Sequence, residues 1–124
     1  MGRMLKEELE KVLRSKELAR LGDSLVNFLV SAALTLIGRP TGVKVPGETL
    51  ARAFLSSRLS KLGKPRGIAP GEAMEAFLAY AWLKGSLSCE ESVEMLYTGL
   101  REGYDVAQAL AKLADYLLEK IEAD

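Results

Sequence analysis

Apolar residues recur along this chain at spacings of three and four, which is the repeat of an amphipathic α-helix. The first stretch shows the repeat plainly, with Leu5, Leu9, Val12 and Leu13 along one side of residues 3–14. Ala, Leu, Glu and Lys dominate and runs of β-branched residues are rare, so helices are favoured over strands. The pattern predicts an all-α helical bundle of about six helices. They are expected over residues 3–14, 16–37, 48–61, 70–85, a stretch that begins after Ser88, and 105–122.

Glycine, proline and capping residues mark the breaks between these helices. Gly38 and Pro40 form a stop signal at the end of the second helix, and Pro70 suits the first turn of the fourth. Ser88 is a favourable cap for the fifth helix, because the two glutamates that follow it lie where the helix dipole stabilises negative charge. No internal repeat divides the chain, so we expect a single domain over residues 1–124. In and before the last helix, the predicted core residues are Tyr104, Leu110, Leu113, Leu117 and Ile121.

The second helix is unusually apolar in its second half, yet a polar stripe runs through it. Arg20, Asp23, Asn27 and Ser31 follow one another at spacings of three and four, which place them along one side of the helix. Such a stripe either faces water or has a specific partner. A glycine inside a helix costs up to about 1 kcal/mol relative to alanine. Gly22 therefore indicates either a close backbone approach or a break in the helix.

The fourth helix carries no charged residue between Glu75 and Lys84. A helix that is apolar on every side belongs in a core or an interface. Glu75 lies one turn inside this helix, and Glu72 lies three residues earlier on the same side. A carboxylate beside a buried helix needs a cation or another partner. Glu72 could simply complement the helix dipole, or the two glutamates could offer oxygens to one hard cation.

The composition narrows the chemistry that this chain can perform. Its 124 residues contain no histidine and one cysteine. That excludes serine–histidine and cysteine–histidine catalysis, histidine-based metal sites, and disulfides or iron–sulfur clusters within one chain. The longest apolar stretch, 13 residues over 25–37, falls short of the about 20 that a membrane span needs, and the N-terminus lacks a secretory signal. We expect a cytoplasmic protein with no membrane partner, in which Cys89 is incidental.

The zero net charge conceals a strong asymmetry along the chain. Residues 1–66 hold 13 basic and six acidic residues, so the first half carries +7 and the second half −7. A local basic strip can bind a phosphate backbone even on a neutral protein. The alternatives are that these residues form solvated faces, or that the two halves pair with each other on folding. The steepest segment holds seven basic residues, which are Arg39, Lys44, Arg52, Arg58, Lys61, Lys64 and Arg66.

Two strings, Leu-Gly-Asp-Ser-Leu-Val at residues 21–26 and Glu-Ala-Met-Glu-Ala-Phe at 72–77, resemble the endonuclease domain of the ribonuclease III family. That family has a signature helix reading Leu-Gly-Asp-Ser/Ala-Val-Leu and a later helix reading Asp-x-x-Glu-Ala-Phe/Leu. The chain is most similar to a compact archaeal branch without a separate domain for binding double-stranded RNA. The strings at residues 21–28, 38–42 and 79–85 carry that closer likeness, and the resemblance spans residues 16–100.

The resemblance implies a homodimeric endoribonuclease that hydrolyses double-stranded or structured RNA with Mg²⁺, or with Mn²⁺. It assigns Asp23 to the signature aspartate, Glu75 to the metal-binding glutamate, and Glu72 to a position where the family has aspartate. The signature helix would pack against its twin, and the basic strip would contact RNA phosphates. Asn27 and Ser24 would orient the metal ligands, unless they pack across the dimer axis instead.

Two departures from the family pattern keep other functions open. Ala19 stands where the family usually has a glutamate, four residues before the aspartate, and Glu17 is offset from that position. Glu72 adds a methylene to one ligand, although Mg²⁺ demands near-ideal octahedral geometry. One alternative is a ribonuclease-III-like domain that binds structured RNA without cutting it. Another is a helical dimerisation or scaffold protein with no role in RNA metabolism.

Overall fold

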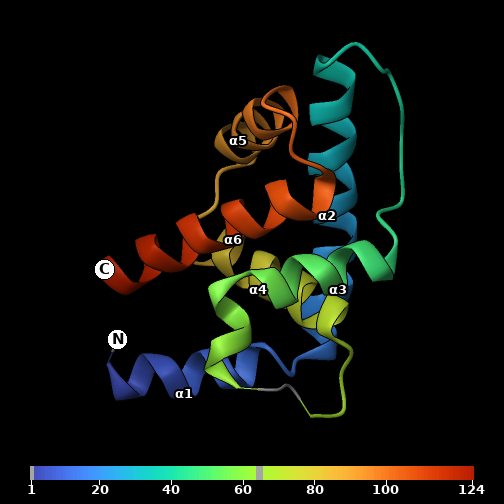
Figure 1. Ribbon diagram of the computed structural model, residues 1–124. Coiled ribbons are helices and arrows are strands. Elements are labelled where there is room, and N and C mark those ends of the chain that lie inside the picture. The colour runs from blue at the N-terminus through green and yellow to red at the C-terminus, as the bar shows by residue number, and fades with distance from the viewer. Residues whose placement is uncertain (1, 64–65) are drawn as a thin grey trace.

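The computed structural model describes residues 2–63 and 66–124, and every regular element in that part of the chain is helical (Figure 1). The prediction of an all-α fold with six helices is therefore confirmed. A short 3₁₀ segment, η1, follows the third helix. The elements are α1 (Arg3–Val12), α2 (Lys16–Leu36), α3 (Gly47–Ser56), η1 (Arg58–Leu62), α4 (Pro70–Leu83), α5 (Cys89–Arg101) and α6 (Val106–Ala123).

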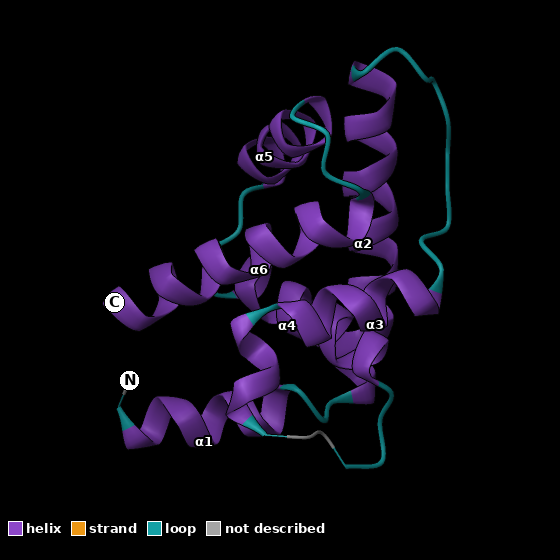
Figure 2. Cartoon of the chain, in the orientation of Figure 1, coloured by secondary structure: helices purple, strands orange, loops and turns teal. Residues whose placement is uncertain are grey.

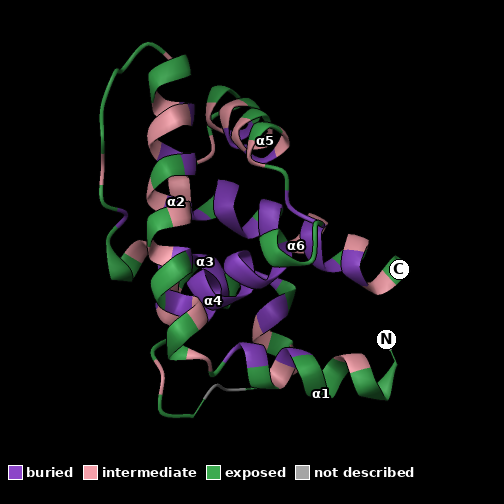
Figure 3. Ribbon diagram, turned by 180° about the vertical axis from the view of Figure 1, so that it is seen from behind, coloured by how far each residue is buried: buried purple, intermediate pink, exposed green. Residues whose placement is uncertain are grey.

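Helix α4 lies at the centre of the core. Every residue from Gly71 to Ala81 except Glu72 is buried, and the helix packs chiefly against α2 and α3 while also contacting α1 and α6. In Figure 3 the buried positions gather on α4 and on the sides of the other helices that face it. The prediction that this helix belongs in the core is confirmed. Removal of its apolar surface from water contributes roughly 25 cal/mol per Å².

Helix α2 is only half buried. Its inner side packs on α4 and α5, whereas Phe28 and Leu36 remain 57% and 60% exposed. Residues 37–46 then run back alongside α2 to the start of α3 (Figure 2). The polar stripe and an exposed apolar face therefore share one helix. No helix of the described residues is long and apolar enough to cross a membrane.

The third predicted helix, 48–61, is wrong in its extent. Helix α3 ends at Ser56 because Ser57 is extended, with φ −91° and ψ 165°. The Ser57 hydroxyl donates a hydrogen bond of 2.8 Å to the carbonyl of Phe54, and it accepts one from the backbone N–H of Leu59. Such local bonds compete with the helix ladder. The backbone N–H of Arg58 then donates to Asp115 at 2.8 Å, which fixes the break against α6.

Helix α5 begins after Ser88, the cap that the sequence predicts, and α6 is capped by Asp105, which the sequence placed inside the last helix. The Ser88 hydroxyl accepts a hydrogen bond from the backbone N–H of Glu91, and Asp105 accepts one from Gln108. Each bond satisfies a backbone donor that has no partner inside its helix. The predicted core leucines and Ile121 of α6 are buried, whereas Tyr104 is only partly buried.

Candidate active site

Helices α2 and α4 approach each other most closely at Gly22. A Cβ atom added to Gly22 would lie 1.9 Å from the carbonyl oxygen of Glu75, so no other residue fits without moving a helix. Gly22 lies inside α2, which continues unbroken through it. The close backbone approach predicted from the sequence is confirmed, and a helix break is excluded. This crossing places Asp23, the next residue along α2, beside Glu75 of α4.

The carboxyl groups of Asp23 and Glu75 line one hollow, and each shifts the pKa of the other. Glu75 is only 8% exposed, and burial together with the neighbouring Asp23 raises its pKa to about 7. The pKa of Asp23 is lowered, first by the hydrogen bond from the Lys44 ammonium and next by Glu75. Near neutral pH the pair thus holds an ionised aspartate and a partly protonated glutamate. Lys44 is the basic residue that pairs directly with this pair of carboxyl groups.

Glu72 lies in the same small hollow, of about 260 Å³, but its carboxylate has another partner. Its Oε1 accepts a hydrogen bond of 3.1 Å from the backbone N–H of Ala69, which caps the start of α4. Within residues 2–63 and 66–124, no three carboxylates or other ligating side chains are grouped as a ready metal site. The role of Glu72 as a ligand stays a prediction. The hollow is lined by Lys16, Ala19, Arg20, Asp23, Lys44, Glu72 and Glu75.

The polar stripe of α2 does not simply face water. Asn27 donates a hydrogen bond of 3.1 Å to Asp23 and accepts one of 2.7 Å from the backbone N–H of Val45. The Ser31 hydroxyl accepts another, of 2.8 Å, from the backbone N–H of Val43. The stripe therefore anchors the loop before α3 and orients Asp23 in one network. Ser24 is exposed, and its side chain takes part in none of the hydrogen bonds found among the described residues.

Comparison with known protein families decides between the classes of helical protein. The family model described as Ribonuclease III matches residues 16–123. The chain belongs to the ribonuclease III family. The comparison with curated proteins finds no match. The resemblance carried by the strings around Asp23 and Glu75 is thus confirmed at the level of the family, and the match extends through α6.

Two residues of the predicted basic strip of this ribonuclease III family member make ion pairs with acidic residues of the second half of the chain. Arg58 makes an ion pair of 2.9 Å with Glu122, and Arg52 makes one of 3.6 Å with Asp105. These two residues follow the alternative in which the basic and acidic halves pair. Lys44 contacts Asp23 instead of facing water alone. Arg39, Lys61 and Arg66 are exposed, and Lys64 lies outside the described residues.

The sequence did not predict that three basic residues lie beside the carboxylates, although Lys44 was expected to contact RNA and Arg20 was placed on the polar stripe. Lys16 and Arg20 line the hollow, and Lys44 reaches it from a loop 21 positions after Asp23. Arg20 stands on the polar stripe, which was the available signal for it. Ala19 lines the same hollow, so no carboxylate enters from the position where the family usually has glutamate.

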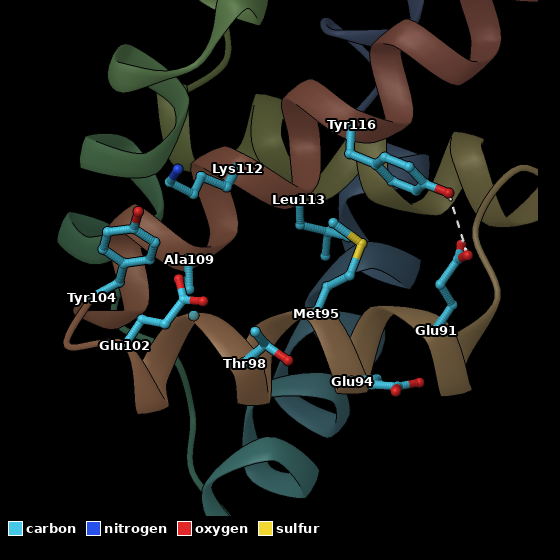
Figure 4. A pocket seen from close by; sticks show the side chains of 11 residues that line it. Glu91, Glu94, Met95, Thr98, Glu102, Tyr104, Ala109, Lys112, Leu113 and Tyr116 are labelled. Atoms are coloured by element: carbon cyan, nitrogen blue, oxygen red, sulfur yellow. Dashed lines mark hydrogen bonds between the residues drawn. The ribbon is translucent and has the colours of Figure 1, made fainter.

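A larger hollow lies between α5 and α6 and has a different character. It measures about 500 Å³, and Figure 4 shows Met95 and Leu113 on its apolar floor between glutamates and tyrosines. The Tyr116 hydroxyl donates to Glu91 at 3.3 Å, the bond drawn dashed in Figure 4. Glu94 and Glu102 add further negative charge to its lining. The net charge of its lining is negative, like that of a phosphate backbone, and would repel RNA. The size of a hollow therefore does not identify the RNA site.

Proposed function

We propose that this chain is a metal-dependent endoribonuclease that cleaves double-stranded or structured RNA as a homodimer. Membership of the ribonuclease III family supports a role in RNA processing. The observation that carries the proposal is the crossing at Gly22, which joins the carboxyl groups of Asp23 and Glu75 in one hollow. The chain has no histidine and one cysteine, so paired carboxylates are the best candidates for catalytic groups.

The donor set of the hollow suits a hard divalent cation. Two neighbouring carboxyl groups repel each other when both are ionised, and the raised pKa of Glu75 reflects its burial first and then the presence of Asp23. Carboxylate oxygens are the ligands that Mg²⁺ prefers. Asp23 and Glu75 would hold the ion, with Glu72 as the third carboxylate of the hollow. The bound ion would supply a water of lowered pKa and stabilise charge that develops on the scissile phosphate.

The basic side chains of the hollow have a distinct task in this proposal. Lys16 and Arg20 are exposed and lie on the same lining as the carboxylates. They would attract a backbone phosphate and hold it beside the site, as shape-based recognition of an RNA duplex requires. Asn27 keeps the Asp23 carboxylate oriented through its 3.1 Å hydrogen bond. In this proposal Lys16 and Arg20 position the RNA phosphate, and the Asn27 amide positions the Asp23 carboxylate.

The exposed apolar face of α2 supports the homodimer. Phe28 and Leu36, together with Val93 and Tyr97 of α5, line an apolar groove of about 510 Å³. Monomeric proteins rarely expose large contiguous apolar patches, and such patches mark sites of interaction with other proteins. We expect Phe28→Glu to raise the dissociation constant of the dimer at least ~100-fold, since a buried charge would replace an aromatic contact. Sedimentation of this variant beside Leu55→Glu, which changes an exposed leucine of α3, measures the effect.

The cleavage assay tests the activity directly. Wild-type protein with Mg²⁺ should cut a long RNA duplex, and Asp23→Asn or Glu75→Gln should lower the rate at least ~100-fold. Glu102→Gln, a matched change in the acidic hollow between α5 and α6, should leave the rate unchanged. Absence of cleavage by the wild type over a wide range of Mg²⁺ and Mn²⁺ would overturn the proposal.

A second function is favoured by two observations at the same site. Ala19 supplies no carboxylate, and Glu72 is engaged in capping α4. A domain that binds structured RNA without cutting it fits both. Duplex binding that weakens with salt, in a protein that takes up no Mn²⁺, would establish this alternative. Duplex binding that is absent even at low salt would point to a dimerisation protein instead.

A further inference from the structure

One loop lysine already acts as a cation toward the candidate ligand Asp23. The Lys44 ammonium donates hydrogen bonds of 3.0 and 3.2 Å to the two carboxylate oxygens of Asp23. It therefore contacts both carboxylate oxygens of Asp23, one of which also accepts a hydrogen bond from Asn27. It also lies in the lining of the hollow that holds Glu72 and Glu75. The contact is placed at the site and not on a remote surface.

The backbone on both sides of Lys44 is fixed to α2. The N–H of Val43 donates to Ser31 at 2.8 Å, and the N–H of Val45 donates to Asn27 at 2.7 Å. Val45 is buried, with an exposed fraction of 3%. Most surface ion pairs gain little, because two long side chains must be ordered to form them. Here other bonds hold the loop backbone, so the fold fixes the point from which the Lys44 side chain, itself 73% exposed, reaches Asp23.

The charged residues around the hollow indicate what the contact between Lys44 and Asp23 does. Three carboxyl groups line the hollow, those of Asp23, Glu72 and Glu75. Among the described residues, Lys44 is the only basic residue that forms an ion pair with any of them. A divalent ion bound to the Asp23 carboxylate would lie beside the Lys44 ammonium, whose positive charge repels it. Ammonium and metal therefore compete for the same carboxylate.

We propose that Lys44 is the resident cation of this site, which neutralises Asp23 in the absence of metal and must be displaced when a divalent ion binds. The proposal rests on the proposed function, because it takes Asp23 and Glu75 as the metal ligands. Lys44 is thus a positioning residue that sets the metal concentration at which the site loads. It also keeps the two carboxylates together in the metal-free protein.

Calorimetric titration of the protein with Mn²⁺ alone at pH 8 tests this competition. We expect Lys44→Met to bind Mn²⁺ about fivefold more tightly than the wild type, which is the effect of removing an ion pair of ordinary strength. Lys44→Arg retains the charge and should stay close to the wild type. Lys6→Met, an exposed lysine of α1, removes the same charge elsewhere and should leave the affinity unchanged.

Chemical labelling of lysines gives a second readout that does not depend on activity. In the wild type, Mn²⁺ should increase the rate at which Lys44 is acetylated, since its ammonium is released, whereas Lys6 should not respond. In Asp23→Asn the increase should vanish. Thermal unfolding in EDTA should show Lys44→Met at a lower melting temperature than the wild type, with a larger upward shift when Mn²⁺ is added.

The outcomes separate the two proposals. If the wild type binds Mn²⁺ and Asp23→Asn abolishes binding, but Lys44→Met binds equally or more weakly, the competition is refuted and the metal site stands. If neither the wild type nor Lys44→Met binds Mn²⁺, the proposed metal site fails and the role of Lys44 fails with it. Tighter binding by Lys44→Met together with metal-dependent labelling of Lys44 supports both.

Discussion

The hollow at the α2–α4 crossing and the hollow between α5 and α6 are both lined by glutamates, but they affect the pKa of those glutamates differently. At the crossing of α2 and α4, Glu75 is buried against Asp23 and its pKa is raised to about 7. Between α5 and α6, Glu94 and Glu102 are exposed, and Glu91 is bonded to Tyr116 and paired with Lys120 at 3.6 Å. The smaller hollow is therefore the better candidate for chemistry. Backbone proximity, not volume, makes the difference.

The crossing itself is the most sensitive point of that comparison. Gly22→Val should destabilise the protein by about 3 kcal/mol or more, because its side chain would overlap the backbone of Glu75. Urea unfolding followed by circular dichroism measures the loss. Gly42→Ala is the matched control, since a Cβ atom there meets nothing within 4 Å. Equal stability of the two variants would show that the helices do not meet closely at Gly22.

The pH dependence of stability distinguishes Glu75 from the glutamates of the larger hollow. Between pH 4.5 and about 7 folded Glu75 keeps a proton that the unfolded chain has lost, so its contribution to stability falls as the pH rises. The loss amounts to about 3 kcal/mol. In EDTA, Glu75→Gln should match the wild type near pH 4.5 and exceed its unfolding free energy at pH 8. Glu94→Gln should follow the wild type throughout, and a pH-independent gain for Glu75→Gln would contradict the burial of this carboxyl.

The smallest expected effects compare one hydrogen-bonding side chain from each hollow. Asn27→Ala removes the bonds to Asp23 and to the backbone of Val45, and should cost about 1–2 kcal/mol. Tyr116→Phe removes a 3.3 Å bond to Glu91 at a partly exposed position, and should cost no more than about 0.5 kcal/mol. Denaturant midpoints of the two variants measure both values. A larger loss for Tyr116→Phe would reverse the ranking of the two hollows.

Much of this arrangement follows from local sequence. The absence of charge after Glu75 predicted the buried helix α4, and a glycine inside an apolar helix predicted the close contact at Gly22. Both signals are local, because helix periodicity and the cost of glycine depend on near neighbours. The pairing of Asp23 with Glu75 needed the resemblance to a family, since periodicity does not state which helices meet.

The remaining features depend on contacts that local patterns do not encode. Helix α3 ends early because the hydroxyl of Ser57 bonds its own backbone and Asp115 receives the next N–H. Arg58 pairs with Glu122, a residue 64 positions away, and no local pattern predicts that contact. Lys44 reaches Asp23 from a loop, and loops have no periodicity from which a side-chain direction could be predicted. The sequence showed the polar stripe of α2, but not that the stripe binds the backbone of that loop.

The most direct test of the central claim is to locate a divalent ion in crystals of this protein grown or soaked with Mn²⁺. The anomalous scattering of manganese identifies the ion without reference to any assumed ligand. We predict a peak bridging the carboxylates of Asp23 and Glu75, with the ammonium of Lys44 moved away from Asp23. A peak among Glu91, Glu94 and Glu102 instead, or no peak at the α2–α4 crossing at saturating Mn²⁺, would contradict the claim.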